Sequence, residues 1–474
     1  MRVTLMCGAA LFAPAAGYAS DLEDRVADLE RKLDLILQKL EGSAAPLSYS
    51  ETAALRDAGA AIEAGKIENP NAPPATSGPG LPLQTVELDT PGGVSAQRTD
   101  PPKPKEGLGF EVGDTSVKFS GYVKLDTSLS RTTGGDLPTN SLGRDFYLPA
   151  LVPVGGDGDG VDIDFNPRET RFTFDMKSAR GGHDIGGRIE FDFQVTSDGN
   201  ERVSNSFTPR MRQAYLTVDN WLFGQAWSTF QDVAALPDNL DFIGPAESTV
   251  FERQPMIRYT RGGWQFAIEQ PETTIADLAN GGARMLPGDD FAPDFVGRYN
   301  HKRDWGHVTA AVIGRALHVE EGMGGSVEDT AVGYGASISG KIKTFDKDDF
   351  RFMVTAGNGI GRYIGLNLDN DAVIDAEGRL DLIPTYTFFT SYRHFWTPNW
   401  RSNFTYGFFR ADTPEFQGEG VGLTDAAQSV HVNLIHTPIR KLDIGVEYIF
   451  ADRETDNELD GQLHRLQFSS KYSF

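Results

Sequence analysis

Arginines recur at alternate positions along several segments whose remaining alternate residues are apolar or aromatic. Arg171 precedes an alternating pair, Phe172 and Phe174, and Arg188 precedes Ile189 and Phe191 in the same way. A guanidinium binds a carboxylate through two parallel hydrogen bonds, so arginines gathered on one face would attract anions. The basic residues in this polar phase are Arg171, Arg188, Arg258, Arg298, Arg315, Arg351, Arg393, Lys177 and Lys341.

Acidic residues accompany these arginines. Glu190, Asp192 and Glu447 share the polar phase, and the segment 231–254 is rich in carboxylates. One interpretation is a transverse field between arginines and an acidic loop, which would orient charged solutes. The other is a network of ion pairs that only fills a polar interior. The charged residues of the segment are Asp232, Asp238, Asp241, Glu247, Glu252 and Arg253.

Two further arginines, Arg210 and Arg212, have an ambiguous orientation, because they share sequence parity with apolar Ala214 and Leu216. We keep them among the candidates. The predicted pore residues are Arg171, Arg188, Arg210, Arg212, Arg258, Arg298, Arg351, Asp232, Glu252 and Arg253.

Signals for catalysis or metal binding are weak. The eight histidines are scattered, and neither H-E-x-x-H nor G-x-S-x-G occurs, so we predict no enzyme, no catalytic residue and no cofactor. The aspartates at 157, 159, 162 and 164 resemble a calcium loop but lack its closing glutamate. We interpret them, and Asp369, Asp371 and Asp375, as solvated acidic loops and predict no metal site.

The candidate arginines must be positioned by strands, because apolar and polar residues alternate with period two from about residue 117 to the end. In the last segment Leu466, Phe468 and Tyr472 share one face, while Gln467 and Lys471 share the other. A soluble β-sandwich or propeller would also alternate. Full charges in mid-strand opposite a heavily aromatic face favour an all-β transmembrane barrel, because an arginine facing lipid at mid-depth costs roughly 2–4 kcal/mol.

Connections alternate between short turns and long loops, as an outer-membrane barrel requires. We count about sixteen strands, a number that leaves an aqueous channel, whereas about eight would be filled by side chains. The predicted strands are 117–129, 166–177, 186–196, 209–219, 221–230, 255–261, 264–270, 294–301, 307–318, 330–344, 350–358, 381–396, 401–411, 428–438, 442–453 and 462–474.

Composition and charge narrow the class of protein. Hydrophobic residues make up 39% of the chain, and after the extreme N-terminus no apolar run is long enough for a transmembrane helix. The net charge of −23 argues against a nucleic-acid partner.

The N-terminal region divides into three predicted segments. Residues 1–19 are typical of a signal peptide, and Cys7, the single cysteine, lies inside it, too early for the alternative of a lipoprotein anchor. Residues 20–42 carry heptads and predict a coiled coil, with a lone amphipathic helix as the alternative. Residues 43–109 form an Ala-, Pro- and Gly-rich linker, and the barrel is expected over 110–474. The heptad positions are Leu22, Val26, Leu29, Leu33, Ile36 and Leu40.

One stretch resembles a known family. Residues 220–232 (NWLFGQAWSTFQD), with 210–215 (RMRQAY) before and 254–259 (QPMIRY) after, are similar to the DcaP-like porins. Arg210, Arg212 and Arg258 match arginine positions of that family, whereas Met211 and Gln213 depart from it. Tyr472 and terminal Phe474 resemble the general assembly signal of outer-membrane barrels.

The resemblance implies a trimeric, sixteen-stranded channel for small anionic solutes, notably dicarboxylates, with the coiled coil in the periplasm. By position, segment 231–254 corresponds to the third outer loop, which in porins folds into the barrel; a loop that stays outside the barrel is the alternative. Expected partners are further copies of the chain, outer-membrane lipid and lipopolysaccharide, and the barrel-assembly machinery. The alternatives are a general porin with little charge preference and a structural anchor with a periplasmic tether.

Overall fold

The computed structural model describes residues 108–474, except 159, 196–198, 201–203, 289, 320–327, 376–377 and 415–419. The predicted signal peptide, coiled coil and almost all of the linker lie outside these residues, and so do their candidate positions, Leu22 to Leu40. The described part belongs to one compact unit that spans Asp100–Phe474.

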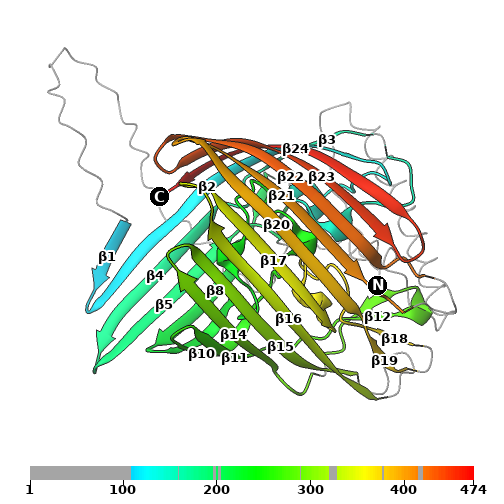
Figure 1. The fold of residues 1–474 in the computed structure, drawn as a ribbon, viewed down its shortest axis with the longest axis horizontal. Helices are drawn as coiled ribbons and strands as arrows, with labels where there is room; N and C mark the ends of the chain where they lie inside the picture. Colours follow the sequence, from blue (N-terminus) through cyan, green and yellow to red (C-terminus); the bar gives the residue numbers. More distant parts are fainter. Residues whose placement is uncertain are drawn as a thin grey trace, which may run out of the picture. The chain divides into compact units, whose positions relative to one another are not determined.

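The main sheet is an antiparallel barrel that closes where β24 pairs with β2 (Figure 1). Its eighteen hydrogen-bonded strands include β1 (Leu108–Val112), which lies outside the ring, and β3 and β4, which together form one barrel strand. The predicted number of sixteen strands is therefore confirmed. The barrel strands are β2 (Thr115–Thr132), β3 (Asp162–Asn166) with β4 (Arg171–Arg180), β5 (His183–Asp192), β8 (Arg210–Val218), β9 (Trp221–Trp227), β10 (Arg253–Arg261), β11 (Trp264–Glu269), β14 (Asp294–Arg303), β15 (Gly306–Val319), β16 (Asp329–Lys343), β17 (Asp349–Asn358), β20 (Pro384–Thr397), β21 (Trp400–Ala411), β22 (Thr424–Ile439), β23 (Leu442–Thr455) and β24 (Asp460–Ser473).

The period-two pattern sorts side chains between the outside of the barrel and its interior. On β24 the side chains of Leu466, Phe468 and Tyr472 are exposed on the outer face, while Arg465 and Gln467 are buried inside. A bilayer offers no hydrogen-bond partners to a free sheet edge, so closure by β2 and β24 satisfies the backbone across the membrane. Among the described residues, no helix is long and apolar enough to span a membrane.

Seven short turns join the strands at one end of the barrel, and long loops join them at the other. At the turn between β4 and β5, Gly181 and Gly182 have φ values of 60° and 88°, a left-handed region that glycine enters without steric cost. In outer-membrane barrels the short turns face the periplasm. In Figure 1 this short-turn end lies on the left, and the long-loop end lies on the right.

Several small elements were not predicted. The strand predicted at 166–177 is interrupted between β3 and β4, where Pro167 lacks the N–H needed for the ladder. Loop residues form a separate sheet of β13, β12, β18 and β19 at the long-loop end. The remaining elements are β6 (Gly199–Asn200), β7 (Ser206–Phe207), β12 (Ile275–Asp277), β13 (Ala283–Met285), β18 (Ala372–Ile374), β19 (Leu380–Leu382), α3 (Leu142–Asp145), and the 3₁₀ helices η1 (Pro149–Leu151), η2 (Val233–Ala235), η3 (Ala246–Ser248), η4 (Leu278–Asn280) and η5 (Gly361–Tyr363).

Three long loops fold inward and share a hydrophobic core. We name them L1 (133–161), L3 (228–252) and L6 (359–383). Val250 of L3 forms a β-bridge with Ile364 of L6, and the Phe251 N–H donates to the Tyr363 carbonyl at 2.9 Å. Tyr147 of L1 donates its N–H to Asp241 of L3 at 2.8 Å. L3 is thus held between two other loops.

Candidate functional site

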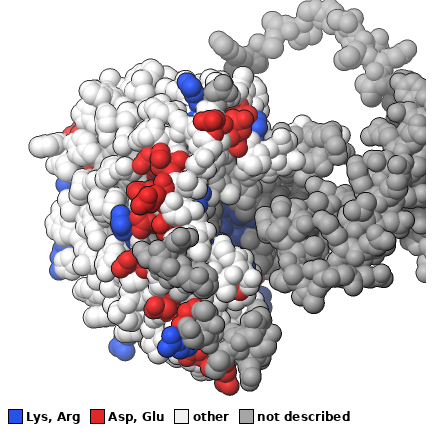
Figure 2. Space-filling view, turned by 90° about the vertical axis from the view of Figure 1, so that its right-hand side faces the viewer, with Lys and Arg blue, Asp and Glu red and all other residues white. Residues whose placement is uncertain are grey.

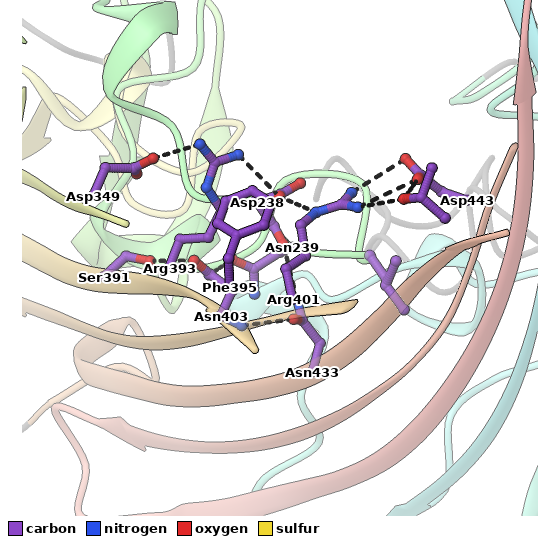
Figure 3. Close-up of polar contacts among 12 residues, drawn as sticks. Asp238, Asn239, Asp349, Ser391, Arg393, Phe395, Arg401, Asn403, Asn433 and Asp443 are labelled. Atoms are coloured by element: carbon purple, nitrogen blue, oxygen red, sulfur yellow. Dashed lines mark hydrogen bonds and ion pairs between the residues drawn. The ribbon is translucent and has the colours of Figure 1, made fainter. Parts of the chain in front are cut away.

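L3 is bound to the inner wall of the barrel by its own carboxylates. Asp232 accepts hydrogen bonds from Arg298 of β14 at 3.1 Å and from His307 of β15 at 2.9 Å. Asp238 bridges Arg393 of β20 at 3.3 Å and Arg401 of β21 at 2.7 Å (Figure 3). These contacts confirm that L3 folds inside the barrel.

Neighbouring arginines keep the carboxyl group of Asp238, which anchors L3 to the wall, in its ionised form. Burial alone would raise the pKa of Asp238, but the guanidinium charges of Arg401 and Arg393 outweigh it and lower the pKa to about 2. Arg401 reaches on to Asp443 at 3.1 Å, and Figure 3 shows the continuous row from Asp349 through Asp238 to Asp443. The loop carboxylate is therefore neutralised by the wall behind it.

This geometry bears on the two interpretations of the acidic loop, a transverse field and a network of ion pairs. Asp241 accepts N–H groups of L1 and of L3 itself, and Glu247 is fully buried and accepts the Ser429 hydroxyl at 2.6 Å. The loop carboxylates are engaged in holding L3 in place. Asp232 and Asp238 are paired with wall arginines, which favours the interpretation of an ion-pair network over that of a transverse field.

A cluster of arginines occupies the wall of β4, β5, β8 and β10. Asp192 of β5 is shared by Arg210 at 2.8 Å, Arg212 at 2.8 Å and Arg171 at 3.6 Å. Glu190, two residues away, accepts the Arg212 Nε at 2.7 Å. We call Arg171, Arg210, Arg212 and Arg253, with Asp192 and Glu190, the arginine cluster.

Arg253 has no carboxylate of its own in this cluster. Its guanidinium lies 4.8 Å from the centre of the Trp227 ring and 5.9 Å from that of Phe251. Within the described residues, its buried Nη1 and the Nε of Arg171 have no hydrogen-bond partner. Four guanidinium groups thus face two carboxylates, which leaves donors and positive charge for an anion.

A β-bulge resolves the orientation of Arg210 and Arg212. Glu190 pairs with Gln213 and Phe191 pairs with Met211, so Arg212 is an extra residue on β8. A bulge reverses the side-chain alternation along the strand. Arg210 and Arg212 therefore point inward although they share parity with Leu216, which is exposed on the outer face.

The motif at residues 220–232 forms β9 and the start of L3. Gly224 has a φ of 128°, and a Cβ atom there would lie 2.4 Å from the Ala214 carbonyl oxygen of β8. Only glycine fits that position. Trp227, three residues on, carries the ring beneath Arg253 and Arg212.

Most of the other predicted residues are held in ion pairs, and the Glu252 carboxylate also accepts the backbone N–H of Arg253. Arg258 of β10 donates to the Trp227 carbonyl at 3.3 Å. The ion pairs join Arg188 to Asp175 at 2.8 Å, Arg298 to Asp232 at 3.1 Å, Arg351 to Asp349 at 2.6 Å, and Glu252 to Arg362 at 3.8 Å. For these residues the interpretation of a lumen filled by ion pairs holds.

Some residues that position L3 were not among the predicted sites. Lys124 donates to the Leu240 carbonyl at 2.6 Å, and Glu447 accepts the Leu240 N–H at 2.6 Å. Lys124 and Arg401 both lie in the polar phase of strongly alternating segments, so the pattern that found Arg171 could have found them. Their partners in L3, Leu240 and Asp238, lie in a loop without such alternation.

The model of the DcaP outer membrane protein family matches residues 157–474, more than half of the chain. The chain belongs to the DcaP family. It is thus an outer-membrane β-barrel channel of the porin kind, and its strands lie in the Gram-negative outer membrane. No curated protein sequence matched it.

Several solved outer-membrane protein structures are similar to this DcaP family member. The outer membrane channel DcaP of Acinetobacter baumannii is 22% identical with a TM-score of 0.63, and the match covers 77% of this chain and 99% of that one. An anion-selective porin from Comamonas acidovorans is 12% identical with a TM-score of 0.48, over 76% and 100% of the two chains. OmpT of Vibrio cholerae is 11% identical with a TM-score of 0.46, over 78% and 100%.

Proposed function

We propose that this DcaP-family channel lets small organic anions, carboxylates among them, diffuse across the outer membrane. The observation that carries the proposal is the arginine cluster, in which four guanidinium groups face two carboxylates. Asp232 and Asp238 of L3 are paired with wall arginines, so these two carboxylates do not add unpaired negative charge to the lumen. A guanidinium with spare donors lowers the barrier for a passing carboxylate without closing the channel.

Reversal potentials in a salt gradient across a planar bilayer test this proposal. The wild-type channel is expected to prefer chloride over potassium. The variants Arg253→Gln and Arg171→Gln should move the reversal potential toward zero, because each removes a guanidinium with an unused donor. Arg180→Gln is the matched control, since it removes the same charge at an exposed turn. Cation preference in the wild type would overturn the proposal.

An equal, small effect of all three variants would favour the alternative of a general porin with little charge preference. In that case the net charge of the whole lumen, and not the arginine cluster, would set the permeability. A channel without conductance steps would instead favour the structural anchor.

We also propose that the chain assembles as a homotrimer with its N-terminal arm in the periplasm. The support is the heptad seam from Leu22 to Leu40, followed by a linker that joins the barrel at β1. Deleting residues 20–42 should convert a trimer band to a monomer band on a semi-native gel while the barrel remains heat-modifiable. A trimer that survives this deletion would contradict the role of the heptads.

A further inference from the structure

A recess lies between the start of L3 and the wall formed by β8–β11, β14 and β15. It has a volume of about 300 Å³, and its lining includes Gln231, Arg258, Lys302, Tyr215 and Trp227. Lys302 is the next-to-last residue of β14, close to a short turn. Arg210 and Arg253 of the arginine cluster, in contrast, are the first residues of β8 and β10, at the long-loop end.

Positive charge in this recess exceeds what its carboxylates neutralise. Asp232 is occupied by Arg298 and His307. Arg258 donates to the Trp227 carbonyl, and among the described residues neither Arg258 nor Lys302 forms an ion pair.

Glu269 also acts electrostatically on Arg258, but its oxygens are already engaged. They accept hydrogen bonds from Ser228, Thr229 and Gln254, each at 2.7 Å. Most of the Arg258 donors therefore remain for a ligand.

Gln231 provides an independent observation. Its side chain is 1% exposed and lines the recess, yet within the described residues neither its amide nitrogen nor its amide oxygen has a hydrogen-bond partner. A buried amide without partners is unfavourable, so a polar ligand group is expected beside it. Its NH₂ group can donate to the same oxyanion as Arg258.

We propose that this recess is a second anion-binding site, in which Arg258 and Gln231 hold the carboxylate of a small organic solute and Lys302 adds charge. The inference rests on the proposed function, because an anion-passing channel delivers the ligand. The site differs from the arginine cluster in location and in its neutral amide donor. It retains a solute near the short-turn end after the solute has passed the cluster.

Current block by citrate tests the site. In single-channel recordings, Arg258→Gln should shorten the dwell time of citrate block at least about fivefold, and Lys302→Gln should shorten it less. Lys471→Gln is the matched control, because it also removes an inward positive charge, but on β24, which does not line the recess. Glycerol serves as the neutral probe and should give no block in any channel.

Gln231→Glu keeps the test independent of any folding defect of the arginine variants. It places a negative charge in the recess and should also shorten the block, while Gln231→Met should have a smaller effect. Equal citrate dwell times in Arg258→Gln, Gln231→Glu and the Lys471→Gln control would overturn the site. The proposed function fails separately, if the wild type shows cation preference in the salt gradient.

Discussion

At the scale of single residues, position decides whether a charge holds structure or meets solute. Asp238 and Arg401 are both inward, but their 2.7 Å contact uses each to fix L3. Arg253 is inward as well, yet it stacks on Trp227 and keeps a donor free. Both Arg401 and Arg253 face inward, so only the three-dimensional partner distinguishes an anchor from a binding residue.

Asp369 of L6 gives a prediction about pH. It is buried, as is Asp371, so the interpretation of a solvated acidic loop was wrong for these two residues. The side chain of Asp369 is 2% exposed, one oxygen accepts the Asn370 N–H at 2.8 Å, and within the described residues the other has no partner. Burial raises the pKa of Asp369 from 3.8 to about 7. A carboxyl whose pKa is raised on folding stabilises the folded protein fully at pH values below its pKa in the unfolded state. That stabilisation is lost as the pH rises to the pKa of the carboxyl in the folded state.

We therefore expect the contribution of Asp369 to lower the heat-modifiability midpoint of the wild type as the pH rises from about 4 to about 7. Asp369→Asn should remove most of that fall, because the amide stays neutral. The exposed Asp381→Asn, in β19 of the same loop, is the control and should keep the wild-type slope. Identical slopes in the wild type and Asp369→Asn would contradict this account.

At the scale of elements, Glu447 of β23 clamps the turn of L3. It is fully buried and accepts the Leu240 N–H at 2.6 Å and the Asn239 amide at 3.2 Å, while its neighbours on β22, His431 and Asn433, lie at 3.1 and 2.9 Å. A hydrogen bond to a charged group contributes about 1.5–3 kcal/mol. The clamp thus fixes the loop that carries Asp238.

Glu447→Gln is expected to loosen L3 without unfolding the barrel, because the amide can accept at one oxygen only. Open-channel current noise should rise severalfold, and the mean conductance should change as L3 samples more positions. Glu454→Gln, an exposed position on the same strand, should leave the noise unchanged. A quiet Glu447→Gln channel would show that L1 and L6 hold L3 without the clamp.

The strands of the barrel could be predicted from the sequence, whereas the bulge and the contacts between loops could not. Alternation predicted all sixteen strands, because each strand has one face toward lipid and one toward polar lumen. It could not orient Arg210 and Arg212, since the extra residue at Arg212 reverses the phase and carries no local signal. The pairing of Val250 with Ile364 between loops depends on contacts far apart in the chain, which periodicity does not report.

At the scale of the whole molecule, charge is distributed unequally between the surface and the lumen. Figure 2 faces the long-loop end and shows Asp and Glu side chains gathered across it. In the described residues, the exposed carboxylates there outnumber the exposed arginines Arg131, Arg284, Arg379 and Arg410. The carboxylates of this acidic rim are Asp136, Asp157, Asp381, Asp412, Glu454, Glu458 and Asp460. The net charge of −23 is thus compatible with an arginine-rich interior.

The acidic rim predicts a salt-dependent rectification. An anion that enters from the long-loop end must cross a negative potential, whereas one that enters from the short-turn end does not. The Debye length is about 10 Å at 0.1 M salt and about 3 Å at 1 M, so the rim acts on entering ions mainly in dilute salt. Channels inserted in one orientation should therefore pass unequal currents at opposite voltages at about 0.1 M salt and nearly equal currents at about 1 M.

The combined variant Asp136→Asn, Glu458→Gln and Asp460→Asn tests the effect of the rim separately from that of the arginines in the lumen. It should reduce the rectification at low salt and leave the sign of the reversal potential unchanged, because the arginine cluster stays intact. The combined variant Asp114→Asn, Asp184→Asn and Asp304→Asn removes the same charge from the short-turn end and should not reduce the rectification. If both variants weaken it equally, net charge and not its placement at the long-loop end governs how anions enter.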